Sequence, residues 1–306
     1  MQLNLESFNE IVDFKEKEIM DECNFGAQYI NIVASPYSNT EVLKRLMENS
    51  LKRGEKILYI GNNIYGKEMV NVKFSSYDNA IYVREKFSLV IYDDISSFSR
   101  YSRFEILSLI SRIIKDSNIK VIAISTEAIL NSVETIYLPS IYNNNVFCEP
   151  RVIKTTIDFY EEIPQNIFEY LTYFMDSNKD VVVVIPREDK LNKVLENIVS
   201  LKDELKYKNV SKNTIGESKG KNIVITSKNN IWKLPKERCE NVIVYCPKVE
   251  SYHYKELLYI SAMGNYGDNK GEIIFLTTKS FFYIEKACFV ARKFNKMLWE
   301  LEILEN

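Results

Sequence analysis

Short, almost continuous apolar segments alternate with amphipathic segments along most of this 306-residue chain. Such apolar segments are typical of strands that are buried on both faces of a parallel sheet. Four of them lie in the first half: Tyr29–Ser35, Lys56–Gly61, Ser88–Tyr92 and Lys120–Ser125. Between them, apolar residues at helical spacing predict helices over Glu41–Arg53, which stops at Gly54, and Arg103–Lys115.

The second half repeats this alternation. Its predicted strands are Asp180–Ile185, Asn222–Thr226, Asn241–Tyr245 and Glu272–Leu276. Its predicted helices are Gln165–Met175, Asp189–Leu201 and a long closing helix from about Ser280. Strands that alternate with helices in both halves predict an α/β fold with two doubly wound parallel sheets.

The boundary between the halves is a polar, Asn-rich stretch between Pro139 and Pro150. We therefore predict an N-terminal domain at 1–138, a linker at 139–151 and a C-terminal domain at 152–306. A second polar stretch, Lys202–Asn222, is rich in lysine. We interpret it as a solvated loop, and contact of its lysines with a nucleic-acid backbone is the alternative.

The composition is that of an ordinary globular protein, with 46% hydrophobic and 27% charged residues. The formal net charge of −2 provides no general attraction for nucleic acid, so any binding must come from a local basic patch. The five cysteines are scattered without a C-x-x-C pair, which argues against a zinc site and for reduced thiols in a cytoplasm. The chain begins without the pattern of a signal peptide, and no apolar stretch reaches the ~20 residues of a membrane span. We expect a cytoplasmic protein.

The segment Val33–Glu41 has the layout of a phosphate-binding loop, namely an apolar strand, a small polar loop and a helix. A working loop needs Gly for close backbone approach, Lys for the β- and γ-phosphates and Ser or Thr for Mg²⁺. Here Ser38, Asn39 and Thr40 stand at the candidate phosphate positions, and only Thr40 keeps the required type. With nine glycines in the whole chain, the composition also argues against a working loop. Read alone, the segment is a capped strand-to-helix turn.

The segment Leu89–Asp94 is an apolar strand that ends in two carboxylates, the layout of a Walker B motif. In an active site, Asp93 is the candidate Mg²⁺ ligand and Asp94 the candidate base that orients the attacking water. Two acidic residues at a strand end are also a common turn signal. The next predicted strand ends in a polar break at Ser125–Ala128.

Taken in order, these segments resemble motifs I, II and III of superfamily 2 helicases, in particular the late competence protein ComFA family. The linker Leu138–Arg151 resembles the segment between the lobes in that family. Ile225–Ser227 resembles the start of motif V, and Ser261–Asp268 resembles motif VI. The resemblance extends from Phe25 to Asn295 and implies two tandem RecA-like domains that act in the uptake of single-stranded DNA.

The departures from the family pattern concern phosphate recognition. The motif VI remnant is Gly264, Asn265, Gly267 and Asp268, in which Asn265 and Asp268 replace two arginines. One such arginine contributes on the order of 10³–10⁵ in rate, and Asn39 replaces the phosphate-loop lysine. We therefore interpret the chain as a non-hydrolysing ComFA-like pseudo-helicase without a cofactor. Its expected partners are single-stranded DNA and a protein from a competence operon. The alternative is a divergent active translocase that uses Mg-ATP.

An enzyme unrelated to helicases is the third hypothesis. The chain has a single histidine, His253, and no G-x-S-x-G segment that could supply a nucleophile for a Ser-His-Asp triad. The position of His253, directly before a predicted helix at Lys255–Ile260, instead indicates a role at the start of that helix.

Overall fold

The computed structural model describes residues 2–25, 27–38, 41–62, 69–114, 118–142, 145–216, 219–248, 251–266 and 271–305. The chain divides into two compact units. Unit 1 comprises Met1–Ile141 and Phe294–Asn306, and unit 2 comprises Tyr142–Lys293. The division between Ile141 and Tyr142 falls inside the stretch that the sequence predicts as a linker. Residues 294–306 group with unit 1, whereas the predicted boundaries include them in the second domain.

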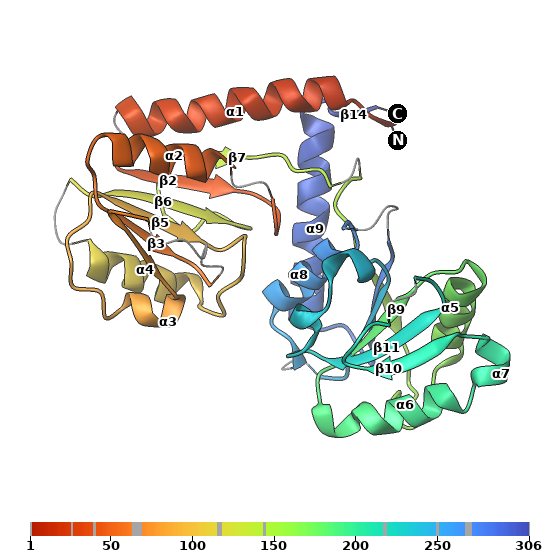
Figure 1. The fold of residues 1–306 in the computed structure, drawn as a ribbon. Coiled ribbons are helices and arrows are strands. Elements are labelled where there is room, and N and C mark those ends of the chain that lie inside the picture. Colours follow the sequence, from red (N-terminus) through yellow and green to blue (C-terminus); the bar gives the residue numbers. More distant parts are fainter. Residues whose placement is uncertain are drawn as a thin grey trace. The chain divides into compact units, whose positions relative to one another are not determined.

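Unit 1 is built on a six-stranded sheet in the order β4-β3-β5-β6-β2-β7, and all its neighbouring strands are parallel. The strands are β2 (Tyr29–Val33), β3 (Ile57–Ile60), β4 (Val72–Ser75), β5 (Leu89–Asp93), β6 (Lys120–Ser125) and β7 (Thr135–Tyr137). Helices α1 (Leu5–Phe25) and α2 (Glu41–Lys52) cover one face, and α3 (Tyr77–Ala80) and α4 (Arg103–Ile113) cover the other (Figure 1). Apolar side chains of β2, β3, β5 and β6 alternate between the two faces, so the sheet is buried on both.

Unit 2 repeats this architecture with the strand order β10-β11-β9-β12-β13-β8, again with parallel neighbours. The strands are β8 (Arg151–Lys154), β9 (Val181–Ile185), β10 (Asn209–Lys212), β11 (Asn222–Ser227), β12 (Val242–Cys246) and β13 (Ile273–Thr277). One face packs against α5 (Gln165–Asp176), α6 (Leu191–Val199) and α7 (Lys202–Leu205). The other face packs against α8 (Tyr254–Met263) and the first part of α9 (Phe282–Glu300) (Figure 1).

The predicted α/β class with two parallel sheets is confirmed. The interpretation of Lys202–Asn222 as a solvated loop is wrong, because this stretch contains α7 and the strand β10, which pairs with β11. Two further strands, β1 (Gln2–Leu3) and β14 (Leu304–Glu305), pair antiparallel within unit 1. Among the helices that the structure describes, none has the length and apolar character that a membrane crossing requires.

Candidate nucleotide site

Three of the predicted motifs lie at the same edge of the unit 1 sheet. Strands β5, β6 and β2 are neighbours and run parallel, so their carboxyl ends lie side by side. The fold therefore brings the Ser35–Ser38 loop, the Asp93-Asp94 pair and the Ser125–Glu127 break to adjacent strand ends, where α/β sheets carry their binding sites. Asn39 and Thr40, the other two candidate phosphate-loop residues, lie outside the described residues.

Asp93, the candidate Mg²⁺ ligand, is only 1% exposed and is bonded within unit 1. Its Oδ1 accepts hydrogen bonds from the main-chain N–H groups of Ile95 and Ser96, each at 3.0 Å. Its Oδ2 accepts a hydrogen bond from the hydroxyl of Tyr59. A carboxylate has about four lone-pair sites, and here three donors use them. As arranged, Asp93 stabilises the turn after β5.

Asp94, the candidate base, is also 1% exposed. Its Oδ1 accepts a hydrogen bond of 2.6 Å from the main-chain N–H of Ser99, and its own N–H donates to the carbonyl of Ile124 at 2.8 Å. The hydroxyls of Ser99 and Tyr92 lie 2.7 Å apart. Burial, with a further contribution from the Asp94 charge, raises the pKa of Tyr92 and of Tyr77 well above the usual value. These contacts order the loop after β5.

In the described part of the candidate phosphate loop, the main-chain N–H groups of Tyr37 and Ser38 bind carbonyls of the protein itself. Pro36 has no N–H, the N–H of Tyr37 donates to the carbonyl of Ile95 at 2.8 Å, and that of Ser38 donates to the carbonyl of Ser35 at 3.2 Å. The turn has Pro at its second position and Tyr37 at its third with φ of 60°, which is the residue pattern of a type II turn. A phosphate cradle needs main-chain N–H groups that point at the ligand, and those of Tyr37 and Ser38 are committed to carbonyls.

Side chains close this turn further. The Ser38 hydroxyl donates to the carbonyl of Ser35 at 2.5 Å and lies 2.6 Å from the hydroxyl of Ser140. At the end of β6, the Ser125 hydroxyl donates to the carbonyl of Glu127 at 2.5 Å. Beside it, Thr126 is 2% exposed and its hydroxyl has no hydrogen-bond partner among the described residues. The hydroxyl groups at this edge therefore mainly satisfy the protein's own carbonyls.

The motif VI remnant lies in unit 2, directly after α8. Asn265 is fully buried and binds the main chain of a neighbouring segment: its Oδ1 accepts from the N–H of Cys148 at 2.7 Å, and its Nδ2 donates to the carbonyl of Val146 at 2.6 Å. Gly264 lies so close that an added Cβ would meet the Cys148 sulfur at 2.9 Å. Gly267 and Asp268 lie outside the described residues. Asn265 therefore holds the segment Val146–Cys148.

Sequence reasoning missed the tyrosines that bind the Asp93-Asp94 turn. Tyr59 lies in β3 and donates to the Asp93 carboxylate. Tyr77 lies in α3, and its hydroxyl is shared between the main-chain carbonyl of Asp93 and that of Ser97, the latter at 2.9 Å. A signal was available, because a tyrosine inside a buried apolar strand needs a partner for its hydroxyl. Nothing in the sequence spacing indicates that this partner is the acidic pair.

Two further predictions can be compared with the structure. His253 is the N-cap of α8: its Nδ1 accepts from the N–H of Lys255 at 3.4 Å, and the Glu256 carboxylate accepts from the His253 N–H at 2.8 Å. The predicted role at a helix start is therefore confirmed. Within the part of the chain that the structure describes, no group of three or more His, Cys, Asp or Glu side chains is placed to hold a metal ion.

Comparison with known proteins identifies the fold. No protein-family model matches the chain, and no curated protein sequence matches it. Among solved structures, it is similar to the DEAH/RHA helicase HrpB of Escherichia coli, with 11% identity over 90% of this chain and 43% of that chain and a TM-score of 0.57. A second structure, of the E. coli DExH-box NTPase HrpB, matches with 11% identity over 90% of this chain and 42% of that one and a TM-score of 0.55.

This chain therefore spans less than half the length of the helicase structures that it matches. At 11% identity the similarity concerns the fold, and the two parallel sheets flanked by helices correspond to the RecA-like domains of helicases. The chain therefore has the fold of two RecA-like domains that these helicase structures contain.

Proposed function

We propose that this chain is a non-hydrolysing helicase-like protein of the ComFA type, which serves as a DNA-binding or scaffold component of DNA uptake or processing. The observation that carries the proposal is the state of the Asp93-Asp94 pair. Both carboxylates are 1% exposed and accept hydrogen bonds from groups of their own unit. Hydrolysis requires one carboxylate on Mg²⁺ and one on the attacking water, whereas here both carboxylates order the protein's own loops.

Two other elements support the same proposal independently. The Ser35–Ser38 turn has already used the N–H groups of Tyr37 and Ser38, and Asn265 in unit 2 binds main chain where the resembled family has an arginine. These positions come from separate strands and from both units, and the resemblance to the helicase motifs implies that all three would recognise phosphate or metal. The apolar faces of both sheets are meanwhile intact. A fold that is kept without its phosphate chemistry favours a binding role.

The proposal is tested by measuring the affinity for a fluorescein-labelled (dT)20 strand by anisotropy, with and without Mg-ATP. A non-hydrolysing binder or scaffold shows the same anisotropy curve in both conditions and no DNA-stimulated release of phosphate. An active translocase, the competing function, couples its DNA affinity to nucleotide. A nucleotide-dependent affinity together with phosphate release would refute the proposal.

The same assay separates residual activity from contamination. If phosphate release is observed, Asp93→Ala must abolish it in a genuine translocase, whereas Asp13→Asn, an exposed change on α1, must leave it unchanged. Activity that survives Asp93→Ala does not come from this site.

A further inference from the structure

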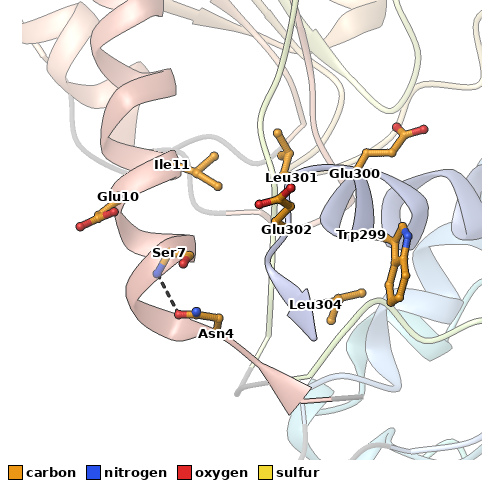
Figure 2. A pocket seen from close by; sticks show the side chains of 9 residues that line it. All are labelled: Asn4, Ser7, Glu10, Ile11, Trp299, Glu300, Leu301, Glu302 and Leu304. Atoms are coloured by element: carbon orange, nitrogen blue, oxygen red, sulfur yellow. Dashed lines mark hydrogen bonds between the residues drawn. The ribbon is translucent and has the colours of Figure 1, made fainter. Parts of the chain in front are cut away.

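Unit 1 has an open hollow of about 850 Å³ between the start of α1 and the end of α9. Figure 2 shows Ile11 of α1 and Glu302 pointing into the space between these two segments, with the indole of Trp299 beside Leu304. Trp299 is 42% exposed, although tryptophan side chains carry much of the energy of protein interfaces when they are covered. The hollow therefore combines an accessible aromatic ring with the apolar side chains of Ile11, Leu301 and Leu304.

The walls of the hollow are held by capped helix ends. The Asn4 side chain caps α1 by accepting from the N–H of Ser7 at 3.0 Å. At the end of α9, the N–H of Glu302 donates to the carbonyl of Trp299, and that of Ile303 donates to the carbonyl of Leu298, each at 3.0 Å. With φ of 57° at Glu302, this is a Schellman termination. The backbone that carries Trp299 and Glu302 is therefore fixed by these hydrogen bonds.

The carboxylates of Glu10, Glu300 and Glu302 line the hollow together with Trp299. The surrounding sequence is strongly acidic as well. Helix α1 has seven acidic and two basic residues, and residues 300–305 add three glutamates without a basic residue. These segments together carry −8, and because the whole chain carries −2, the remainder carries +6. The two segments that form the hollow are therefore acidic, and of the lining carboxylates Glu300 is paired with Lys296 at 3.1 Å.

We propose that this hollow is a docking site for a basic segment of a partner protein, with a Lys or Arg side chain against the Trp299 ring and the flanking glutamates. A cation over an indole face is stabilised by the ring quadrupole, and the carboxylates attract and orient the same cation. The acidic surroundings repel the phosphates of DNA, so this surface is distinct from any DNA contact. The inference does not depend on whether the chain hydrolyses ATP.

The test uses Trp299 as its reporter. The chain has two tryptophans, Trp232 and Trp299. In the Trp232→Phe variant, all tryptophan emission therefore comes from Trp299. The probe is the peptide Ac-(Arg-Ala)4-NH2, and Ac-(Gln-Ala)4-NH2 is the neutral comparison. We expect the arginine peptide to change the Trp299 emission saturably and the glutamine peptide to leave it unchanged.

Matched variants separate docking from diffuse attraction. Removing two lining charges with Glu10→Gln and Glu302→Gln should weaken peptide binding roughly tenfold, because each exposed ion pair contributes modestly. Removing two exposed charges of α1 outside the hollow, with Asp13→Asn and Asp21→Asn, changes the net charge equally and should alter the affinity less than about twofold.

Three outcomes would overturn the proposal. The first is an unchanged Trp299 emission with the arginine peptide. The second is an equal loss of affinity in both double variants, which means that the attraction is not localised. The third is a saturable change in Trp299 emission with (dT)20, which assigns the surface to nucleic acid. A far-UV circular dichroism spectrum of each variant verifies that the folded chain is being compared.

Discussion

Asn265, a residue of the candidate motif VI segment, provides a sharp test of the idea that this position has a structural role. The side chain is fully buried and forms two hydrogen bonds to main chain, of 2.7 Å with the Cys148 N–H and 2.6 Å with the Val146 carbonyl. Asn265→Ala removes both. The Cys148 N–H then stays buried without its acceptor, because Cys148 is only 2% exposed.

The expected cost follows from these two bonds. A buried donor that loses its partner costs about 1–3 kcal/mol, and an ordinary intramolecular hydrogen bond contributes about 0.5–1.5 kcal/mol. The stranded Cys148 N–H belongs to the first class, and the half-buried Val146 carbonyl belongs to the second. We therefore expect Asn265→Ala to lower the free energy of unfolding of unit 2 by about 2–4 kcal/mol. Asn265→Arg should also destabilise unit 2, because a fully buried site has no room for a guanidinium group.

The assay must follow unit 2 separately, because two units need not unfold together. Trp232 packs against the core of unit 2, and Trp299 belongs to unit 1. In a Trp299→Phe background, urea unfolding followed by tryptophan fluorescence therefore reports unit 2. Asn229→Ala is the matched control, since Asn229 is exposed and such substitutions usually change stability by less than about 0.5 kcal/mol. A loss of less than about 0.5 kcal/mol for Asn265→Ala would refute the structural role.

Three further predictions concern other parts of the chain. Tyr59→Phe removes the phenolic donor to Asp93 and should lower the stability of unit 1 by about 1–3 kcal/mol in thermal unfolding; no change would mean that Asp93 does not depend on this bond. Burial raises the pKa of Cys23 and of Cys239 to about 12, so the native protein should react slowly with Ellman's reagent at pH 8 and quickly in urea; rapid reaction of these thiols in the native state contradicts their burial. Glu302→Gly relieves a positive φ and should raise stability by about 0.5–1 kcal/mol in urea unfolding, whereas a decrease contradicts the helix end described above.

The inner strands of both sheets could be predicted from the sequence, and the outer ones could not. The eight predicted segments correspond to β2, β3, β5 and β6 in unit 1 and to β9, β11, β12 and β13 in unit 2. Each of these is almost entirely buried, so its sequence is a continuous apolar run. Burial on both faces is what makes such strands visible in a sequence.

The four missed strands of the two parallel sheets are β4, β7, β8 and β10, and each lies at a sheet edge. Edge strands are short and partly exposed, and β8 and β10 have no fully buried residue. Their sequences, such as Asn209–Lys212, therefore resemble loops. Strand β10 is defined by its pairing with β11, a long-range contact that no local pattern contains.

The sequence predicts at which sheet edge the candidate site lies, but it does not predict the hydrogen-bond partners of the candidate residues. Strand order brings Asp93, Asp94 and Ser38 to one edge, as the motif order indicates. The partners of these residues, above all Tyr59 on β3 and Ser140, come from segments that the motifs do not include. Whether a carboxylate at a strand end is open to a metal ion depends on these tertiary neighbours, and a sequence motif does not contain them.

The central proposal is that the described candidate phosphate-site residues are committed to internal bonds. Isothermal titration of the full chain with Mg-ATP tests it most directly. With the amides of Tyr37 and Ser38 and the carboxylates of Asp93 and Asp94 all engaged within the protein, we expect no saturable heat up to millimolar nucleotide. Saturable binding with a micromolar dissociation constant, lost in Asp93→Ala, would contradict the account.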